Sequence, residues 1–86
     1  MKKLVMDLDG TLTIDVPGPY EHKVPNLEVV AQLRAYRERG FQICIFTARN
    51  MRTYEGEVGK INVHTLPIIL DWLDRHSIPY DEVLVG

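Results

Sequence analysis

The segment Lys3-Leu-Val-Met-Asp-Leu-Asp-Gly-Thr11 decides the fold of this 86-residue chain. Its apolar first part is short and closes on acidic and glycine residues, which predicts a buried strand of a parallel sheet over Lys3–Leu8. Two carboxylates, Asp7 and Asp9, stand at the end of that strand. Open α/β sheets bind their ligands outside the carboxyl ends of the strands. The segment therefore predicts both the first strand and the place of a ligand site.

The rest of the chain alternates loop, helix and strand patterns. Asn26 is a good N-cap, Gly40 is a good helix stop, and Pro67 is tolerated in the first turn of a helix. The patterns predict loops at Thr11–Pro25 and Thr47–Lys60 (the latter with room for a turn of helix), helices at Leu27–Arg39 and from His64 or Thr65 to His76, and strands at Phe41–Phe46 and from Glu82. This order implies parallel strands with right-handed crossovers. We therefore predict one three-layer α/β domain over residues 1–86.

Composition narrows the class of protein. Hydrophobic residues make up 45% and charged residues 26% of the chain, as in ordinary soluble globular proteins. A net charge of −2 gives no basic face for nucleic acid. Asp7 and Asp9 interrupt the apolar start that a secretory signal would need, and no stretch reaches the roughly 18 apolar residues of a membrane span. The single cysteine, Cys44, suits a reducing compartment, so we expect a cytoplasmic protein without nucleic-acid or membrane partners.

The acidic pair calls for a positive partner. Two carboxylates one residue apart at a strand end are costly unless a cation offsets them, and Mg²⁺ prefers such oxygen ligands. With the metal bound, one carboxylate can remain an ionised nucleophile while its neighbour passes protons as general acid and base. Gly10 lets the main chain approach a substrate, and Gly10 and Thr11 can offer N–H groups to an anion. The competing interpretation is a capped turn with two solvated aspartates.

A second group of candidates follows the second strand. Thr47 comes directly after it, which in a parallel sheet places the hydroxyl on the same edge as Asp7, although a threonine there is usually a turn residue. Arg49, next to Ala48, is a candidate contact for phosphate or substrate, with a surface arginine as the alternative. Lys60 is a further candidate cation, although a lysine flanking a helix is usually solvated.

These stretches carry a resemblance to a known family. Asp7-Leu-Asp-Gly-Thr11 and Ile45-Phe-Thr-Ala-Arg49 resemble the first two motifs of the haloacid dehalogenase (HAD) superfamily. Gly59-Lys-Ile-Asn-Val-His-Thr-Leu-Pro67 and Ile78-Pro-Tyr-Asp81 resemble a narrower group, the small capless phosphatases of capsule polysaccharide biosynthesis. The resemblance implies a Rossmannoid core with a short parallel sheet and no cap domain.

The same resemblance implies a mechanism and a substrate class. Asp7 would attack phosphorus to form an aspartyl-phosphate, and Asp9 would protonate the leaving oxygen and later activate water. Asp7 and the main-chain carbonyl of Asp9 would hold Mg²⁺, while Gly10, Thr11, Thr47, Ala48, Arg49 and Lys60 are the candidate phosphate contacts. The substrate would be a small phosphorylated metabolite, with a sugar phosphate of polysaccharide synthesis as one candidate. The main alternative is a non-catalytic module that binds phosphate or a phosphosugar. A receiver-type phosphorylation switch would need its phospho-accepting aspartate after a later strand.

The sequence also departs from the family pattern. The family's phosphate-binding lysine and second acidic pair would follow Val85-Gly86, where the sequence stops, so we expect a core truncated after its third strand. Lys60 is the candidate substitute for that lysine. The family's fourth strand would lie beside the first, so we expect an exposed first strand that invites pairing with another chain. This predicts a homo-oligomer, with exchange of elements between chains as one form of it.

Overall fold

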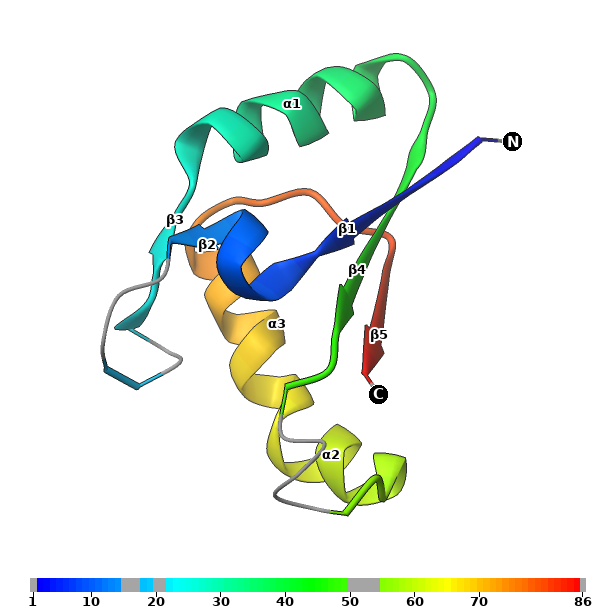
Figure 1. Ribbon diagram of the computed structural model, residues 1–86. Coiled ribbons are helices and arrows are strands. Elements are labelled where there is room, and N and C mark those ends of the chain that lie inside the picture. The colour runs from blue at the N-terminus through cyan, green and yellow to red at the C-terminus, as the bar shows by residue number, and fades with distance from the viewer. Residues whose placement is uncertain (1, 15–17, 20–21, 50–54, 86) are drawn as a thin grey trace.

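The computed structural model describes residues 2–14, 18–19, 22–49 and 55–85 (Figure 1). Its elements follow one another as β1 (Lys3–Asp7), the turn η1 (Leu8–Leu12), β2 (Thr13–Ile14), β3 (Val24–Pro25), α1 (Leu27–Glu38), β4 (Gln42–Thr47), α2 (Val58–His64), α3 (Leu66–Arg75) and β5 (Glu82–Val85). The three predicted main strands and two predicted helices are confirmed to within one or two residues at their ends.

The two predicted loops contain more structure than the sequence pattern indicated. The loop at Thr47–Lys60 was predicted with room for a turn of helix, and residues 58–60 form the first turn of α2, which runs on to His64. Residues 13–14 and 24–25 were also predicted as loop, and they form a small antiparallel pair in which Thr13 faces Pro25. Residues 15–17, 20–21 and 50–54 of these loops lie outside the described residues. Isolated strands of two residues have no periodicity for a sequence pattern to detect.

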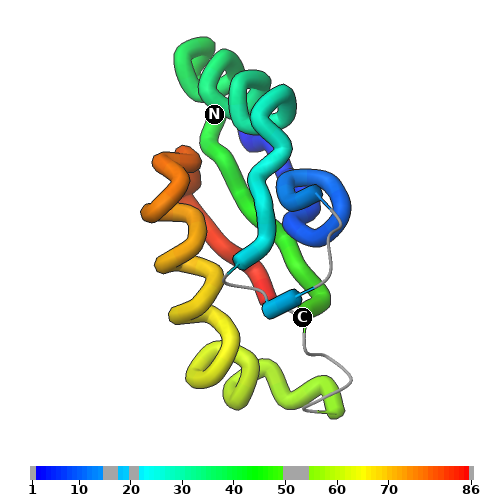
Figure 2. The backbone as a smooth tube through the Cα atoms, turned by 90° about the vertical axis from the view of Figure 1, so that its left-hand side faces the viewer, coloured from blue at the N-terminus to red at the C-terminus, as the bar shows by residue number. Residues whose placement is uncertain are grey.

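The main sheet has the order β1-β4-β5, and both neighbouring pairs are parallel. Asp7 is in register with Phe46, and Thr47 is in register with Val85. Figure 2 shows the strands running between α3 on one side and the η1 turn on the other. The strand order advances in a single direction along the chain, so right-handed crossovers place both connections on the same face of the sheet.

The core lies between that face and the helices. Ile43 and Ile45 of β4 are fully buried and pack with Leu33 of α1 and with Trp72 and Leu73 of α3. These apolar contacts account for most of the stability that a chain of this size can gain by burial. The α/β class with a short parallel sheet is confirmed, and the third layer of the predicted arrangement is not among the described residues.

The opposite face of the sheet carries apolar side chains in the open. Alternate residues of a strand point to opposite faces, so Val5, Phe46 and Leu84 share the face away from the core. All three are exposed, and Val5 most of all, at 58%. In the order β1-β4-β5, β1 is also an edge strand, as the sequence predicted.

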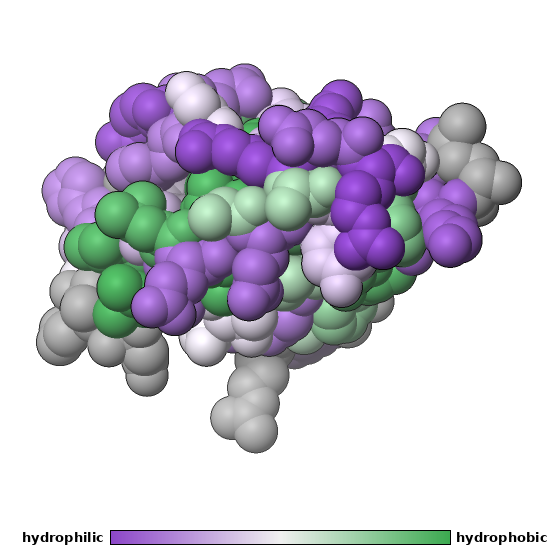
Figure 3. Space-filling model, turned by 90° about the horizontal axis from the view of Figure 1, so that it is seen from above, coloured by the Kyte–Doolittle hydropathy of each residue, from purple (hydrophilic) through white to green (hydrophobic). Residues whose placement is uncertain are grey.

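Helix α1 begins and ends as its sequence predicts. Asn26 caps it, since Asn26 Oδ1 accepts from Val29 N at 3.5 Å. Gly40 follows its last turn with φ of 88°, a left-handed conformation that favours glycine. Figure 3 looks down on this part of the molecule, where hydrophilic side chains lie beside a band of hydrophobic ones. No helix among the described residues is long and apolar enough to cross a membrane.

Two long-range hydrogen bonds tie the segment after η1 to the core. The indole Nε1 of Trp72 donates to the Lys23 carbonyl at 2.7 Å. The amide of Asn26 donates to the Leu12 carbonyl at 2.7 Å. The buried Trp72 therefore fixes the main chain at Lys23, and the bond from Asn26 joins that segment to Leu12 at the end of η1.

Candidate functional site

The carboxyl ends of β1 and β4 lie next to each other, and polar side chains gather there. Asp7 is the last residue of β1, and Thr47 is the last residue of β4, one position beyond the partner of Asp7. Thr47 is fully buried. The prediction that Thr47 and Asp7 share one edge of the sheet is confirmed, because the parallel register brings both strand ends to it.

The η1 turn carries the chain back over this edge. Gly10 has φ of 79° within the turn, and a Cβ placed there would meet no atom within 4 Å. Glycine is therefore needed for its conformation and not for space. The Gly10 amide donates to Thr13 Oγ1 at 3.2 Å, so this N–H group, a candidate for binding an anion, is already engaged. The turn places Asp9 over the end of β4.

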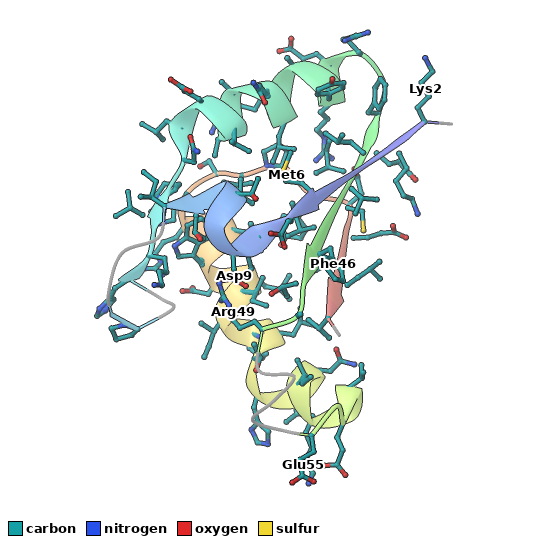
Figure 4. The ribbon with its side chains drawn as sticks, in the orientation of Figure 1. Lys2, Met6, Asp9, Phe46, Arg49 and Glu55 are labelled. Atoms are coloured by element: carbon teal, nitrogen blue, oxygen red, sulfur yellow. The ribbon has the colours of Figure 1, made fainter. Side chains whose placement is uncertain are left out.

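Both oxygens of the Asp9 carboxylate are held by side chains from the end of β4. The Thr47 hydroxyl donates to Asp9 Oδ2 at 2.8 Å. The Arg49 guanidinium donates to Asp9 Oδ1 through Nη2 at 2.7 Å and through Nε at 3.2 Å. The amide of Arg49 also donates to Thr47 Oγ1 at 2.9 Å, which fixes the hydroxyl that reaches Asp9. Figure 4 shows Asp9 and Arg49 side by side below the η1 turn.

The burial of this ion pair is uneven. The side chain of Arg49 is only 2% exposed, whereas that of Asp9 is half-buried. A buried guanidinium without a carboxylate would carry a large desolvation cost, so the pair with Asp9 is required for Arg49 to sit there. Since Asp9 reaches the surface, the pair lies at the boundary between the core and the ligand-binding edge.

Asp7 differs from Asp9 in having no such partner. Its side chain is exposed and makes no hydrogen bond or ion pair with any described residue. The site thus combines one free carboxylate with one that is fully engaged. A free, exposed carboxylate at a strand end is available both as a nucleophile and as a ligand for a hard cation.

The other candidate residues do not join the hydrogen bonds that hold Asp9 among the described residues. Thr11 is half-buried in the η1 turn, and Ala48 is exposed between Thr47 and Arg49. Lys60 lies on α2, and its Nζ is 2.7 Å from Glu57 Oε2. The structure gives Lys60 a partner on its own helix and does not bring it into the network of Asp9, so its role as the phosphate-binding lysine stays a prediction.

The residues of the site suit Mg²⁺ in part. Asp7 supplies one unengaged carboxylate, and the main-chain carbonyl of Asp9 is the second oxygen that the family pattern assigns. Mg²⁺ is commonly held by one or two carboxylates and keeps several water ligands. Within the described ranges, no group of three or more histidine, cysteine, aspartate or glutamate side chains is placed to hold a metal. These residues therefore fit a hydrated Mg²⁺ better than an all-protein cage.

A parallel α/β sheet with an Asp-Leu-Asp-Gly-Thr turn at the end of its first strand defines a class of phosphoryl-handling enzymes. The sequence profile of haloacid dehalogenase-like hydrolases matches residues 4–70. The chain therefore belongs to this family of phosphatase-type hydrolases, whose members typically use Mg²⁺.

Two solved structures resemble this chain. A crystal structure of an MCSG target from Vibrio cholerae is 64% identical with a TM-score of 0.97, covering 100% of this chain and 70% of that one. A chain in the structure of the Pnkp1/Rnl/Hen1 RNA repair complex is 23% identical with a TM-score of 0.67, covering 99% of this chain and 26% of that one. The second likeness concerns the fold alone. No curated protein sequence matches the chain.

Sequence reasoning missed what Arg49 and Asp81 contact. Arg49 was predicted to touch phosphate or substrate, and its guanidinium lies on Asp9. Asp81 is not among the candidate residues of the sequence, but its Oδ2 accepts from the Ile43 amide at 2.8 Å and its Oδ1 accepts from Arg37 Nη2 at 3.2 Å. The position of Asp81 directly before a strand was the available signal, since a short acidic side chain there can reach a neighbouring main chain.

Proposed function

We propose that this protein is a Mg²⁺-dependent phosphomonoesterase that transfers the phosphoryl group of a small phosphorylated metabolite to Asp7. The observation that carries the proposal is the contrast between the two aspartates. Asp7 is exposed and has no side-chain partner in the part of the chain that the structure describes, while Asp9 beside it is held by Thr47 and Arg49. This is the division of labour that a nucleophile and a general acid/base require.

In the first half of the reaction, a carboxylate oxygen of Asp7 attacks phosphorus and the bond to the leaving oxygen breaks. Asp9, protonated in this step, gives its proton to that oxygen, so the alcohol leaves neutral. Asp7 then carries the phosphoryl group as an aspartyl-phosphate. Thr47 donates its hydroxyl proton to a phosphoryl oxygen, which favours the charge distribution of phosphoryl transfer.

In the second half, water attacks phosphorus and Asp9 accepts a proton from it. The bond between phosphorus and the Asp7 oxygen breaks, and Asp7 is restored as a carboxylate. In the structure both carboxylate oxygens of Asp9 accept hydrogen bonds, Oδ2 from the Thr47 hydroxyl and Oδ1 from the Arg49 guanidinium. When bound to Asp7 and the Asp9 carbonyl, Mg²⁺ would offset the negative charge of the phosphoryl oxygens.

The substrate class rests on weaker support. The stretch Gly59–Pro67, which forms most of α2 and the start of α3, resembles the capless phosphatases of capsule polysaccharide biosynthesis. A sugar phosphate is therefore the substrate that we propose to test first. A buried free thiol at Cys44 accords with work in a reducing cytoplasm.

Release of phosphate from an aryl phosphate and from a panel of sugar phosphates, with and without Mg²⁺, tests the proposal. We expect turnover that requires Mg²⁺ and that falls by about 10³-fold or more in Asp7→Asn, because the nucleophile is lost. A matched control, Asp71→Asn, changes an exposed aspartate of α3 paired with Arg75 and should keep full activity. Saturable binding of a sugar phosphate without any turnover would instead favour a non-catalytic phosphosugar-binding module.

We also propose that the chain associates with a second copy through β1. The support is the edge position of β1 and the exposure of Val5 on it, since an uncovered edge strand offers main-chain hydrogen-bond groups to another strand. Analytical ultracentrifugation at micromolar concentration should show a dimer or larger species that Val5→Lys dissociates. A monomer at that concentration would contradict this proposal.

A further inference from the structure

We propose that Arg49 is a positioning residue, which holds Oδ1 of Asp9 so that Oδ2 is the oxygen that gives and takes the proton. This inference rests on the proposed function, because it assigns the two oxygens of the general acid/base different tasks. It also gives Arg49 a partner other than the phosphate that its sequence position suggested.

The two carboxylate oxygens of Asp9 accept different hydrogen bonds. Oδ1 accepts two bonds from one guanidinium, at 2.7 and 3.2 Å, and Oδ2 accepts one from the Thr47 hydroxyl at 2.8 Å. Paired bonds from a guanidinium fix orientation as well as charge, since the group is planar and always protonated. An oxygen held by arginine in this way is a poor place for a proton.

The Thr47 hydroxyl has a single proton to donate. A hydroxyl can donate to one acceptor at a time, and in this structure the acceptor is Asp9 Oδ2. If Thr47 turns its proton to a phosphoryl oxygen, Oδ2 loses the one side-chain donor that the described residues give it, while Oδ1 keeps both of its bonds. Substrate binding would then free the oxygen that must carry the proton, and Arg49 would keep the carboxyl group in place.

Arg49 is buried. The side chain of Arg49 is 2% exposed, and the main-chain amide of Arg49 donates to Thr47 Oγ1. The guanidinium therefore has little freedom to follow a ligand. Its neighbour Asp9 reaches the surface, so substrate meets the aspartate first. The geometry therefore favours a role through Asp9 over direct contact with phosphate.

The kinetic test compares Arg49→Lys and Arg49→Gln with the wild type, and then repeats Arg49→Gln in Asp9→Asn. A positioning role predicts that Arg49→Gln lowers kcat at least about tenfold with KM nearly unchanged, and that Arg49→Lys keeps part of the kcat that Arg49→Gln loses. In the Asp9→Asn protein, the further change Arg49→Gln should cause no additional loss of kcat. Arg37→Gln, at an Arg–Asp pair outside the site, is the matched control and should leave kcat unchanged.

A rise of KM with kcat intact would overturn the inference in favour of phosphate contact. An Arg49→Gln protein whose activity per folded molecule equals that of the wild type would overturn it in favour of a purely structural role. Circular dichroism establishes the folded fraction of each variant. If Arg49→Gln does not fold, Arg49→Lys decides the same question, because it keeps the charge and loses the paired bonds.

A spectroscopic measurement separates this inference from the proposed function. The Nε–H signal of Arg49 in a ¹⁵N spectrum should be shifted in Asp9→Asn and unchanged in Asp7→Asn. The same position in all three proteins would overturn the Arg49–Asp9 contact. A wild type that turns over no phosphoester would overturn the proposed function and the catalytic part of the inference, while this spectrum would still decide the contact.

Discussion

Arg49–Asp9 at the carboxyl end of the sheet and Arg37–Asp81 at the start of β4 join the same two kinds of side chain in opposite settings. Arg49 is 2% exposed, whereas Arg37 is 47% exposed. The other carboxylate oxygen of Asp81 accepts from the Ile43 amide, and the main-chain amide of Asp81 donates to the Ile43 carbonyl at 2.7 Å. The other carboxylate oxygen of Asp9 accepts from the hydroxyl of Thr47.

The difference shows how one chemical pair serves two purposes. Around Asp81 the bonds end on the main chain of a central strand, so they fasten the connection from α3 to the sheet. Around Asp9 they end on side chains at the carboxyl edge of the sheet, beside Asp7. Burying Arg49 costs desolvation that a surface pair such as Arg37–Asp81 avoids. We propose that Arg49 is buried in spite of this cost because it holds the carboxylate of Asp9 in position.

The largest effect that separates the two pairs should be on turnover. Asp9→Asn removes the general acid/base and should lower kcat by roughly 10²- to 10⁴-fold. Asp81→Asn keeps a side-chain acceptor at an equivalent place and should leave the activity per folded molecule unchanged. Steady-state kinetics of both variants, corrected for folded fraction, measure this. Equal losses in the two variants would break the comparison.

The next effect is on the free energy of unfolding. Asp81→Ala leaves the amide of the buried Ile43 without its side-chain acceptor, which should cost about 1–3 kcal/mol. Urea denaturation of the purified variant measures the loss. Asp74→Ala is a suitable control, because the carboxylate of Asp74 accepts from the exposed hydroxyl of Tyr80 and not from a main-chain amide of the described residues. An Asp81→Ala protein as stable as the wild type would remove the structural role from this pair.

A smaller effect is expected at the arginine of the exposed pair. Arg37→Gln breaks a solvent-exposed ion pair and should change the free energy of unfolding by less than about 1 kcal/mol. The change should shrink further as salt is added, because exposed charges are screened. Denaturation at low and high salt checks both statements. A loss well above that bound, insensitive to salt, would place Arg37 among the main supports of the fold.

The smallest effect belongs to Lys3–Glu82, an ion pair across the open face of the sheet with Nζ and Oε2 2.8 Å apart. The hydrogen bond that the Lys3 ammonium donates to Glu82 raises the pKa of Lys3 above its usual 10.5. Because the folded state binds this proton more tightly, the stabilisation is present below pH 10.5 and is lost as the pH rises through the raised value. Unfolding midpoints of wild type and Glu82→Gln should differ slightly at neutral pH and converge in strong alkali.

The sequence predicted the fold well because its signals are local. A short apolar run before Asp7, the N-cap at Asn26 and the apolar stripes of the two long helices each fix one element, and the order of elements fixes the parallel sheet. The carboxyl-end rule then places Asp7 and Thr47 on the same edge. None of these inferences required knowing where any side chain points.

The contacts of the charged side chains could not be predicted in the same way. Arg49 lies only two residues after Thr47, yet its partner Asp9 is 40 residues away in sequence. A long, flexible side chain can reach toward solvent, substrate or a neighbouring turn, and the choice depends on the burial that packing of the whole core creates. The same holds for Asp81, whose partner amide belongs to a strand 38 residues earlier.

We propose that Asp7, whose carboxylate has no partner among the described residues, takes the phosphoryl group while Asp9 is held beside it. Borohydride reduction during turnover, followed by mass spectrometry of the N-terminal peptide, tests it most directly, since an acyl phosphate is reduced to the alcohol and a free carboxylate is not. We predict reduction at Asp7 alone, dependent on both Mg²⁺ and substrate. Reduction at Asp9, or turnover that leaves both aspartates intact, would contradict the account.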